Sequence, residues 1–266
     1  MSKFNKEEQV KIAELIDNHT NSIERSKNRL EGDKIPDRNI PTIYWNLGRK
    51  YRIVGCLYIP EGNIDVAREK FLQSAKYFTT AEKKARDRPP YANQFRRIPF
   101  TLAEGIYSAA LAGDQTYQQS LADRIIELQS DQLNPEDDID PDDFDKDKYY
   151  LAQCLGQAVS GSVSQQSLNK LSRINQNKST YTSLYGRGII KFAEGIQNKE
   201  VALIRDGIKS LIEYHEQDLN DENIVELIMA PEATAIYIIA RQKNYDVEIN
   251  NEFIPNRLVG AVTDDP

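Results

Sequence analysis

The stretch PFTLAEGIYSAALAGDQTYQQSLADRII, Pro99 to Ile126, decides how this sequence folds. Its first half is a helical pattern rich in small and apolar residues, and Gly113 is the residue type that most readily ends a helix. Asp114 follows directly and is typical of a helix N-cap. The next apolar residues recur at helical spacing and predict a buried stripe, formed by Tyr117, Leu121, Ile125 and Leu128. The stretch therefore predicts two helices joined by a tight turn.

The same plan recurs along the chain. The tetrapeptide AEGI occurs at Ala103 to Ile106 and again at Ala193 to Ile196, and each copy precedes a turn and an amphipathic helix. Asn5 is expected to begin the first helix, with a glutamate three residues on as in a capping box. Asn63 and Asn198 are expected to cap two further helices. The sequence predicts an all-α fold of stacked antiparallel helical hairpins, an irregular repeat-like bundle.

A chain of this length is enough for one large helical domain or two intimate ones. We therefore predict a single all-helical domain over residues 1–266. A division into two lobes, 1–133 and 148–266, joined by an acidic loop at 134–147, remains open as the finer alternative.

The negative charge of the chain is concentrated in this acidic loop. The sequence has 41 acidic and 34 basic residues, a net charge of -7. Asn134 to Asp147 (NPEDDIDPDDFDKD) holds eight carboxylates and one lysine, which leaves 33 residues of each sign in the remainder. A charge concentrated in one place can steer a partner to that place.

We predict that this segment and the aromatic residues beside it bind a partner. A solvated connector is the plain alternative, with Tyr149 and Tyr150 simply beginning the packed face of the next helix. A calcium loop of the EF-hand type is not supported, because counting from Asp138 puts Asp143 where glycine is needed and Tyr149 where the bidentate glutamate is needed. The predicted partner-binding residues are Glu136, Asp137, Asp138, Asp140, Asp142, Asp143, Phe144, Asp145, Tyr149 and Tyr150.

No catalytic, metal-binding or cofactor-binding motif is found in the sequence, so we expect no catalytic residues, no metal, no cofactor and no enzymatic activity. His19 and His215 fall on apolar helical stripes, where packed histidines are the default. Glu104 and Glu194, one in each AEGI copy, could form a pair of carboxylates, but helix-surface glutamates are far commoner and are what we expect. An enzyme assembled from dispersed residues would instead show a deep pocket with shifted pKa values.

Three further features bound the class of protein. A basic cluster from Lys83 to Arg97 is read as a solvated helix end or a counter-charge, and the overall acidity argues against direct nucleic-acid binding. Cys56 and Cys154 lie in apolar helical patterns and are expected as buried thiols. The N-terminus has no apolar run of signal-peptide length and no window is apolar enough to span a membrane, so a cytoplasmic location is expected.

Two stretches carry a family likeness. Pro99 to Ile126, quoted above, is one, and PEATAIYIIARQKNYDVEINNEFIPNRLV, Pro231 to Val259, is the other. Together they resemble the Immunity protein 49 family of bacterial polymorphic toxin systems. The resembling features are the small-residue turn at Ala112 to Asp114, the Ala-rich helix at Ala233 to Arg241 and the pair Ile254-Pro255.

The resemblance implies an all-helical, non-enzymatic immunity protein. Such a protein binds and neutralises a cognate toxin by occluding its active site or substrate groove, and many such toxins are nucleases. An acidic, aromatic-bearing surface would then compete with nucleic acid for a basic groove of the toxin. The alternative is a helical-repeat scaffold that binds a peptide or protein partner in a concave groove.

Overall fold

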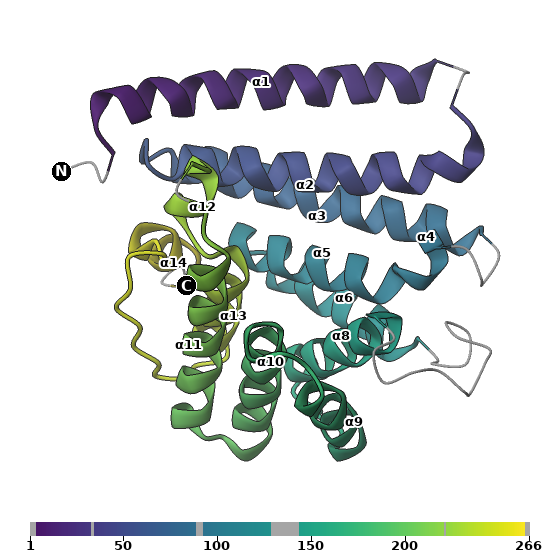
Figure 1. Ribbon diagram of the computed structural model, residues 1–266, viewed down its shortest axis with the longest axis vertical. Helices are drawn as coiled ribbons and strands as arrows, with labels where there is room; N and C mark the ends of the chain where they lie inside the picture. Colours follow the sequence, from purple (N-terminus) through teal and green to yellow (C-terminus); the bar gives the residue numbers. More distant parts are fainter. Residues whose placement is uncertain (1–3, 33–34, 89–92, 129–143, 221, 264–266) are drawn as a thin grey trace.

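The computed structural model describes residues 4–32, 35–88, 93–128, 144–220 and 222–263, and this part of the chain is helical with no strand (Figure 1). The predicted all-α class is confirmed. The helices are α1 (Lys6–Glu31), η1 (Asp37–Asn39), α2 (Ile40–Tyr58), α3 (Ile64–Arg86), α4 (Asn93–Arg96), α5 (Ile98–Ala112), α6 (Gln115–Ile126), α8 (Phe144–Ser160), α9 (Gln165–Gln176), α10 (Thr180–Asn198), α11 (Val201–Asp218), α12 (Ile224–Ile228), α13 (Pro231–Gln242) and α14 (Asn256–Thr263).

Helix α5 lies at the centre of the molecule. All its residues except Phe100 are buried. A helix that is apolar on every side must be surrounded by others, and α5 contacts α3, α6, α8, α13 and α14. The helix ends where predicted, because Gly113 adopts a left-handed conformation with φ of 82°.

Short turns join consecutive helices into packed pairs. Asp114 caps α6 by accepting a hydrogen bond from the amide of Tyr117, as predicted. Asn5 likewise forms the predicted capping box at α1. The prediction for Asn198 is wrong, because this residue ends α10 and Glu200 precedes α11. Here Lys199 adopts the left-handed backbone conformation, which is uncommon for lysine and could not be predicted from the residue type.

The chain path brings its late helices back to the early ones. Helices α1, α2 and α3 lie along one side of the molecule, and α11 and α13 run crosswise to them (Figure 1). Helix α13 packs against both α11 and α5. One cluster of buried apolar side chains includes residues on both sides of the acidic segment, such as Leu57 and Ile208.

The acidic loop was predicted one turn of helix too long. Helix α8 begins at Phe144, so the last four residues of the predicted loop, 144–147, are helical. In the described part of the chain no helix is both long and apolar enough to cross a membrane.

Candidate functional site

A cavity of about 1020 Å³, partly open to solvent, lies between the N-terminal helices and the crosswise helices. We call it the main cavity. Its walls come from α1, α2, α5, α8, α9, α10, α11, α12 and α13, so segments far apart in the sequence meet there. Sites of this kind for small ligands usually measure about 300–1,000 Å³, which puts the main cavity at the upper end.

Three charged side chains, one each from α2, α5 and α13, meet in the lining of the main cavity. Arg52 of α2 contacts Glu104 of α5, with 2.7 Å between Nη2 and Oε2. The other guanidinium nitrogen, Nη1, lies 3.6 Å from Oε1 of Glu232, in the first turn of α13. The side chains of Arg52, Glu104 and Glu232 are 14, 5 and 27 % exposed. We call these three residues the floor cluster.

Burial and mutual charge shift the pKa values within the floor cluster. Burial raises the pKa of Glu104, and the neighbouring Glu232 raises it further, while Arg52 opposes both effects. Burial alone would lower the pKa of Arg52, but the two carboxylates outweigh it and the pKa is raised. Two carboxylates face one guanidinium, so the floor cluster carries one more negative than positive charge when all three groups are ionised.

Tyr185 and Tyr214 line the wall beside the floor cluster, and the buried Tyr107 contacts Tyr185. The hydroxyl groups of Tyr107 and Tyr185 are 2.8 Å apart and share a hydrogen bond. Burial raises the pKa of Tyr185, and Tyr107, Glu232 and Glu104 raise it further. The ring of Tyr214 packs edge-on against Tyr185, with 5.4 Å between centroids. This wall is both aromatic and close to carboxylate charge.

Cationic side chains of the main cavity are held by aromatic rings or carboxylates elsewhere in the wall. The guanidinium of Arg49 lies 5.0 Å from the ring centre of Trp45. The ammonium of Lys148 lies 4.7 Å from the ring centre of Phe100. Lys178 pairs with Asp147, the last residue of the acidic segment, at 2.5 Å.

Both histidines and one cysteine also line the main cavity. His215 hydrogen-bonds the backbone carbonyl oxygen of Glu226 at 2.8 Å. Burial lowers the pKa of His19, and the nearby Lys50 adds to the effect. Burial also raises the pKa of Cys56 to about 12, so this thiol is protonated near neutral pH. The expectation of buried thiols is confirmed for Cys56 and Cys154.

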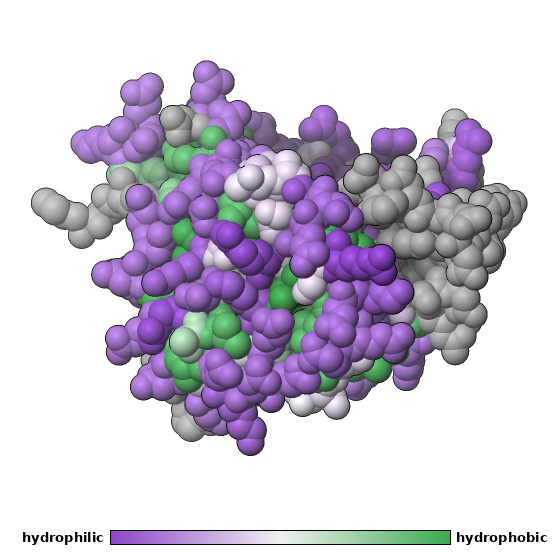
Figure 2. All heavy atoms as spheres, turned by 60° about the horizontal axis from the view of Figure 1, so that its bottom comes forward, coloured by the Kyte–Doolittle hydropathy of each residue, from purple (hydrophilic) through white to green (hydrophobic). Residues whose placement is uncertain are grey.

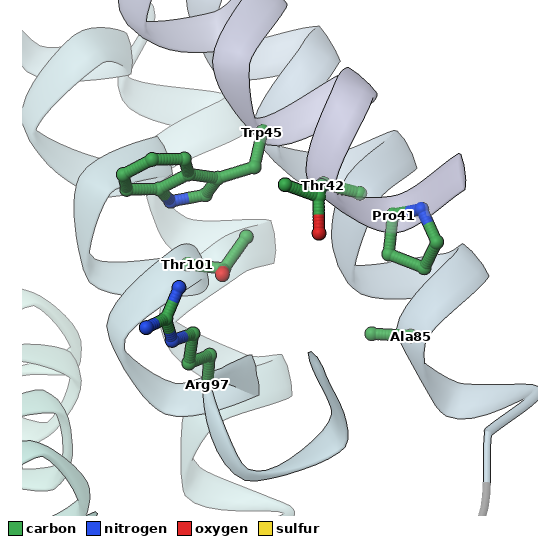
Figure 3. Close-up of a pocket in the computed structure, with 7 residues that line it drawn as sticks. Pro41, Thr42, Trp45, Ala85, Arg97 and Thr101 are labelled. Atoms are coloured by element: carbon green, nitrogen blue, oxygen red, sulfur yellow. The ribbon is translucent and has the colours of Figure 1, made fainter. Parts of the chain in front are cut away.

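A second cavity of about 170 Å³, the small cavity, adjoins the first through Trp45, which lines both. Figure 3 shows Pro41, Thr42 and Trp45 of α2 on one side and Thr101 and Arg97 on the other, with the guanidinium pointing toward the indole. The buried indole nitrogen has no hydrogen-bond partner.

The structure describes only part of the predicted partner-binding segment. Positions 136–143 lie outside the described residues, as do the side chains of Phe144 and Asp145. Tyr149 and Tyr150 pack partly buried against the core, and the Tyr149 hydroxyl donates to the carbonyl of Leu128 at 3.0 Å. Their packing favours the structural role that the sequence left open.

The basic cluster has a partner that the sequence did not indicate. Arg86 and Arg124 both form ion pairs with Glu82 of α3, which is fully buried. Arg88 donates to the backbone carbonyl of Asp37. At least part of this cluster therefore serves the fold.

Sequence reasoning missed the floor cluster. Glu104 was expected on a helix surface, and this is wrong, because the helix that carries it is central.

Among the described residues, no group of three or more histidines, cysteines or carboxylates is arranged to hold a metal ion. No family model, curated protein or solved structure matches the chain.

Proposed function

We propose that this chain is a binding protein that neutralises a toxin, and that the main cavity is part of the surface that binds it. The observation that carries the proposal is that several charged side chains of the cavity are held in ion pairs. Arg52 holds Glu104, and Lys178 holds Asp147. In the described structure no hydrogen bond joins either cavity histidine to a thiol, hydroxyl or carboxylate. A histidine in such a pair is one common activator of a catalytic nucleophile.

One observation favours catalysis instead. The cavity is deep and Glu104 has a raised pKa, as catalytic carboxyl groups often do. Glu104 is however only 5 % exposed and is held by Arg52, so a ligand cannot reach it without breaking that pair. The Cys56 thiol, with a pKa of about 12, is a poor nucleophile near neutral pH. These two facts favour binding over catalysis.

The identification of the partner as a toxin is supported by the resemblance to the Immunity protein 49 family. The two stretches that carry it, Pro99 to Ile126 and Pro231 to Val259, each contribute one carboxylate to the floor cluster. The segments on which the likeness rests therefore meet at the main cavity. A nuclease is one class of toxin that would present the basic surface expected to meet an acidic protein.

The acidic segment is proposed to steer the toxin to this cavity. Its last residue, Asp147, belongs to the cavity wall, and Lys148 and Leu151 follow on the same helix. Polar side chains cover most of the face shown in Figure 2, and apolar side chains appear there only as small separate areas. A charged segment at the cavity wall would attract an oppositely charged partner toward the cavity.

The proposal is tested with the product of the adjacent gene. Cells producing that protein should grow when they also produce this chain. The variant Val225→Trp fills the wall of the main cavity, whereas Val66→Trp adds the same ring on the exposed face of α3. We expect Val66→Trp to protect cells and bind as the wild type does, and Val225→Trp to bind at least tenfold more weakly while melting at a similar temperature.

Each result has a distinct meaning. Failure of the wild type to protect would refute toxin neutralisation, and binding without protection would favour the scaffold alternative. Full protection by Val225→Trp would place the interface outside the main cavity.

The steering role has its own test. Replacing Asp137, Asp138, Asp140 and Asp142 by Asn should slow association and leave dissociation nearly unchanged, because charge acts mainly on the encounter. Raising the salt should slow association of the wild type more than that of the variant. Equal association rates of the wild type and the variant at low salt would show that the acidic segment is only a solvated connector.

A further inference from the structure

We infer that the floor of the main cavity binds one positively charged group carried on an apolar stem, and that the group is the guanidinium of an arginine side chain of the partner. The assignment of this group to the partner rests on the proposed function. The binding preference itself rests on the geometry of the floor cluster and of the walls around it.

The first step is that Arg52 contacts its two carboxylates at unequal distances. Glu104 receives a close charge-assisted contact at 2.7 Å. Glu232 is 3.6 Å away, beyond a good hydrogen bond, and the nitrogen facing it, Nη1, has no hydrogen-bond partner. The guanidinium charge of Arg52 is therefore balanced mainly by Glu104. The Glu232 carboxylate is the one that can bind a cation entering the cavity.

The second step is that Arg52 balances the charge of Glu232 only from a distance. Glu232 is 27 % exposed and lines the main cavity, where its charge also raises the pKa of Cys56 and Tyr185. Charges interact more strongly in such partly buried surroundings than in water. A cation that enters the cavity would balance the floor cluster, whereas an anion would meet the surplus negative charge.

The third step is that the cavity's own cations have other contacts. Arg49 lies over Trp45, and Lys148 lies over Phe100. Lys178 pairs with Asp147. Lys11, which also lines the cavity, donates to the backbone carbonyl of Glu222. These contacts hold the four cations against other parts of the wall, and a cation from a ligand can supply the closer contact that Glu232 lacks.

The walls above the floor suit an aliphatic stem with a flat cationic end. Tyr185 and Tyr214 line the main cavity and offer ring faces or edges to a guanidinium. Leu15, Ile53 and Met229 line it as well and would cover a methylene chain. Arginine is enriched at the centres of protein interfaces for this combination of stem and planar charge.

The test uses two small molecules of nearly the same shape. Butylguanidinium carries the charge, and butylurea is its neutral counterpart. Calorimetric titration of the wild type should show butylguanidinium binding at least tenfold more strongly than butylurea. Glu232→Gln should abolish the preference, and Glu232→Asp should keep part of it. Glu69→Gln, which removes a 62 % exposed carboxylate outside the cavity, should leave the preference unchanged.

Equal binding of the two molecules by the wild type would overturn the inference, whether or not any variant folds. An unchanged preference in folded Glu232→Gln would also overturn it. A cation preference in a protein that fails to protect cells would refute the proposed function and leave the site standing. Protection of cells by a protein that shows no cation preference would support the proposed function and refute the cation site.

Discussion

Replacing Arg52 by Met should destabilise the fold strongly, because it leaves two carboxylates facing each other without their cation. Methionine keeps much of the aliphatic stem, so lost packing adds little. Removing one partner of a buried ion pair costs about 3–5 kcal/mol. Glu104, at 5 % exposure, accounts for most of this cost, and Glu232, at 27 %, is better hydrated. We expect a loss of about 3–5 kcal/mol in the free energy of unfolding at pH 7.

The loss should shrink as the pH falls. Arg52 lowers the pKa of Glu104, so its removal raises further a pKa that is already above the ordinary 4.5. An acid with a raised pKa in the folded state contributes stability that is fully present below its unfolded pKa and is lost as the pH rises through the folded pKa. The penalty of Arg52→Met should therefore be smaller at pH 5 than at pH 7. The difference is at most about 1.4 kcal/mol per pH unit.

Urea unfolding followed by circular dichroism at both pH values measures these quantities. Arg187→Met is the matched control, since Arg187 pairs with Glu213 at 3.0 Å while both side chains are about half exposed, at 45 and 51 %. Exposed pairs contribute about 1 kcal/mol or less. If Arg52→Met costs no more than Arg187→Met, or costs the same at pH 5 and pH 7, the account of the floor cluster is wrong.

Three further predictions concern the frame around the site. Gly207→Ala should cost about 1–3 kcal/mol in urea unfolding, because its Cβ would lie 2.7 Å from a backbone carbonyl oxygen of the facing helix, while Gly32→Ala, whose Cβ would come no closer than 3.5 Å to the carbonyl oxygen of Asn28, should be nearly neutral. Cys56 and Cys154, each with a pKa raised to about 12 by burial, should react with a thiol reagent at pH 8 only after unfolding; rapid labelling of the native protein would contradict this. Asp114→Ala should lose about 1 kcal/mol by the same unfolding measurement, and an unchanged midpoint would argue against the cap.

The local elements could be predicted from the sequence because their signals are local. The turn at Gly113 and Asp114 needs only neighbouring residues to specify it, and both play the predicted parts. The apolar stripe of α6 is set by helical spacing alone, and Leu121 and Ile125 are buried as expected. Helix ends were less certain. Asn198 was a suitable cap by residue type, but the preceding helix simply continued through it.

The floor cluster could not be predicted in the same way, because its members are brought together by packing across the whole chain. Arg52, Glu104 and Glu232 lie on α2, α5 and α13, and nothing in the spacing of one specifies the position of another. The acidic segment, by contrast, is conspicuous in the sequence because its charges are consecutive. Consecutive charges indicate composition and not proximity to a cavity. Asp147, whose side chain the structure describes, lies in the cavity wall.

One signal for the floor cluster was nevertheless present in the sequence. Glu104 stands alone as a charge in the helix IPFTLAEGIYSAALA, which is apolar on every side. A helix of that kind is buried all round, and a buried carboxylate requires a cation or hydrogen-bond donors. The same reasoning applies to other chains built of helical hairpins. A single carboxylate on the central helix indicates an arginine or lysine on a neighbouring helix. Here that neighbour is Arg52, and the second carboxylate that it holds less closely, Glu232, is what turns a structural ion pair into a candidate binding site.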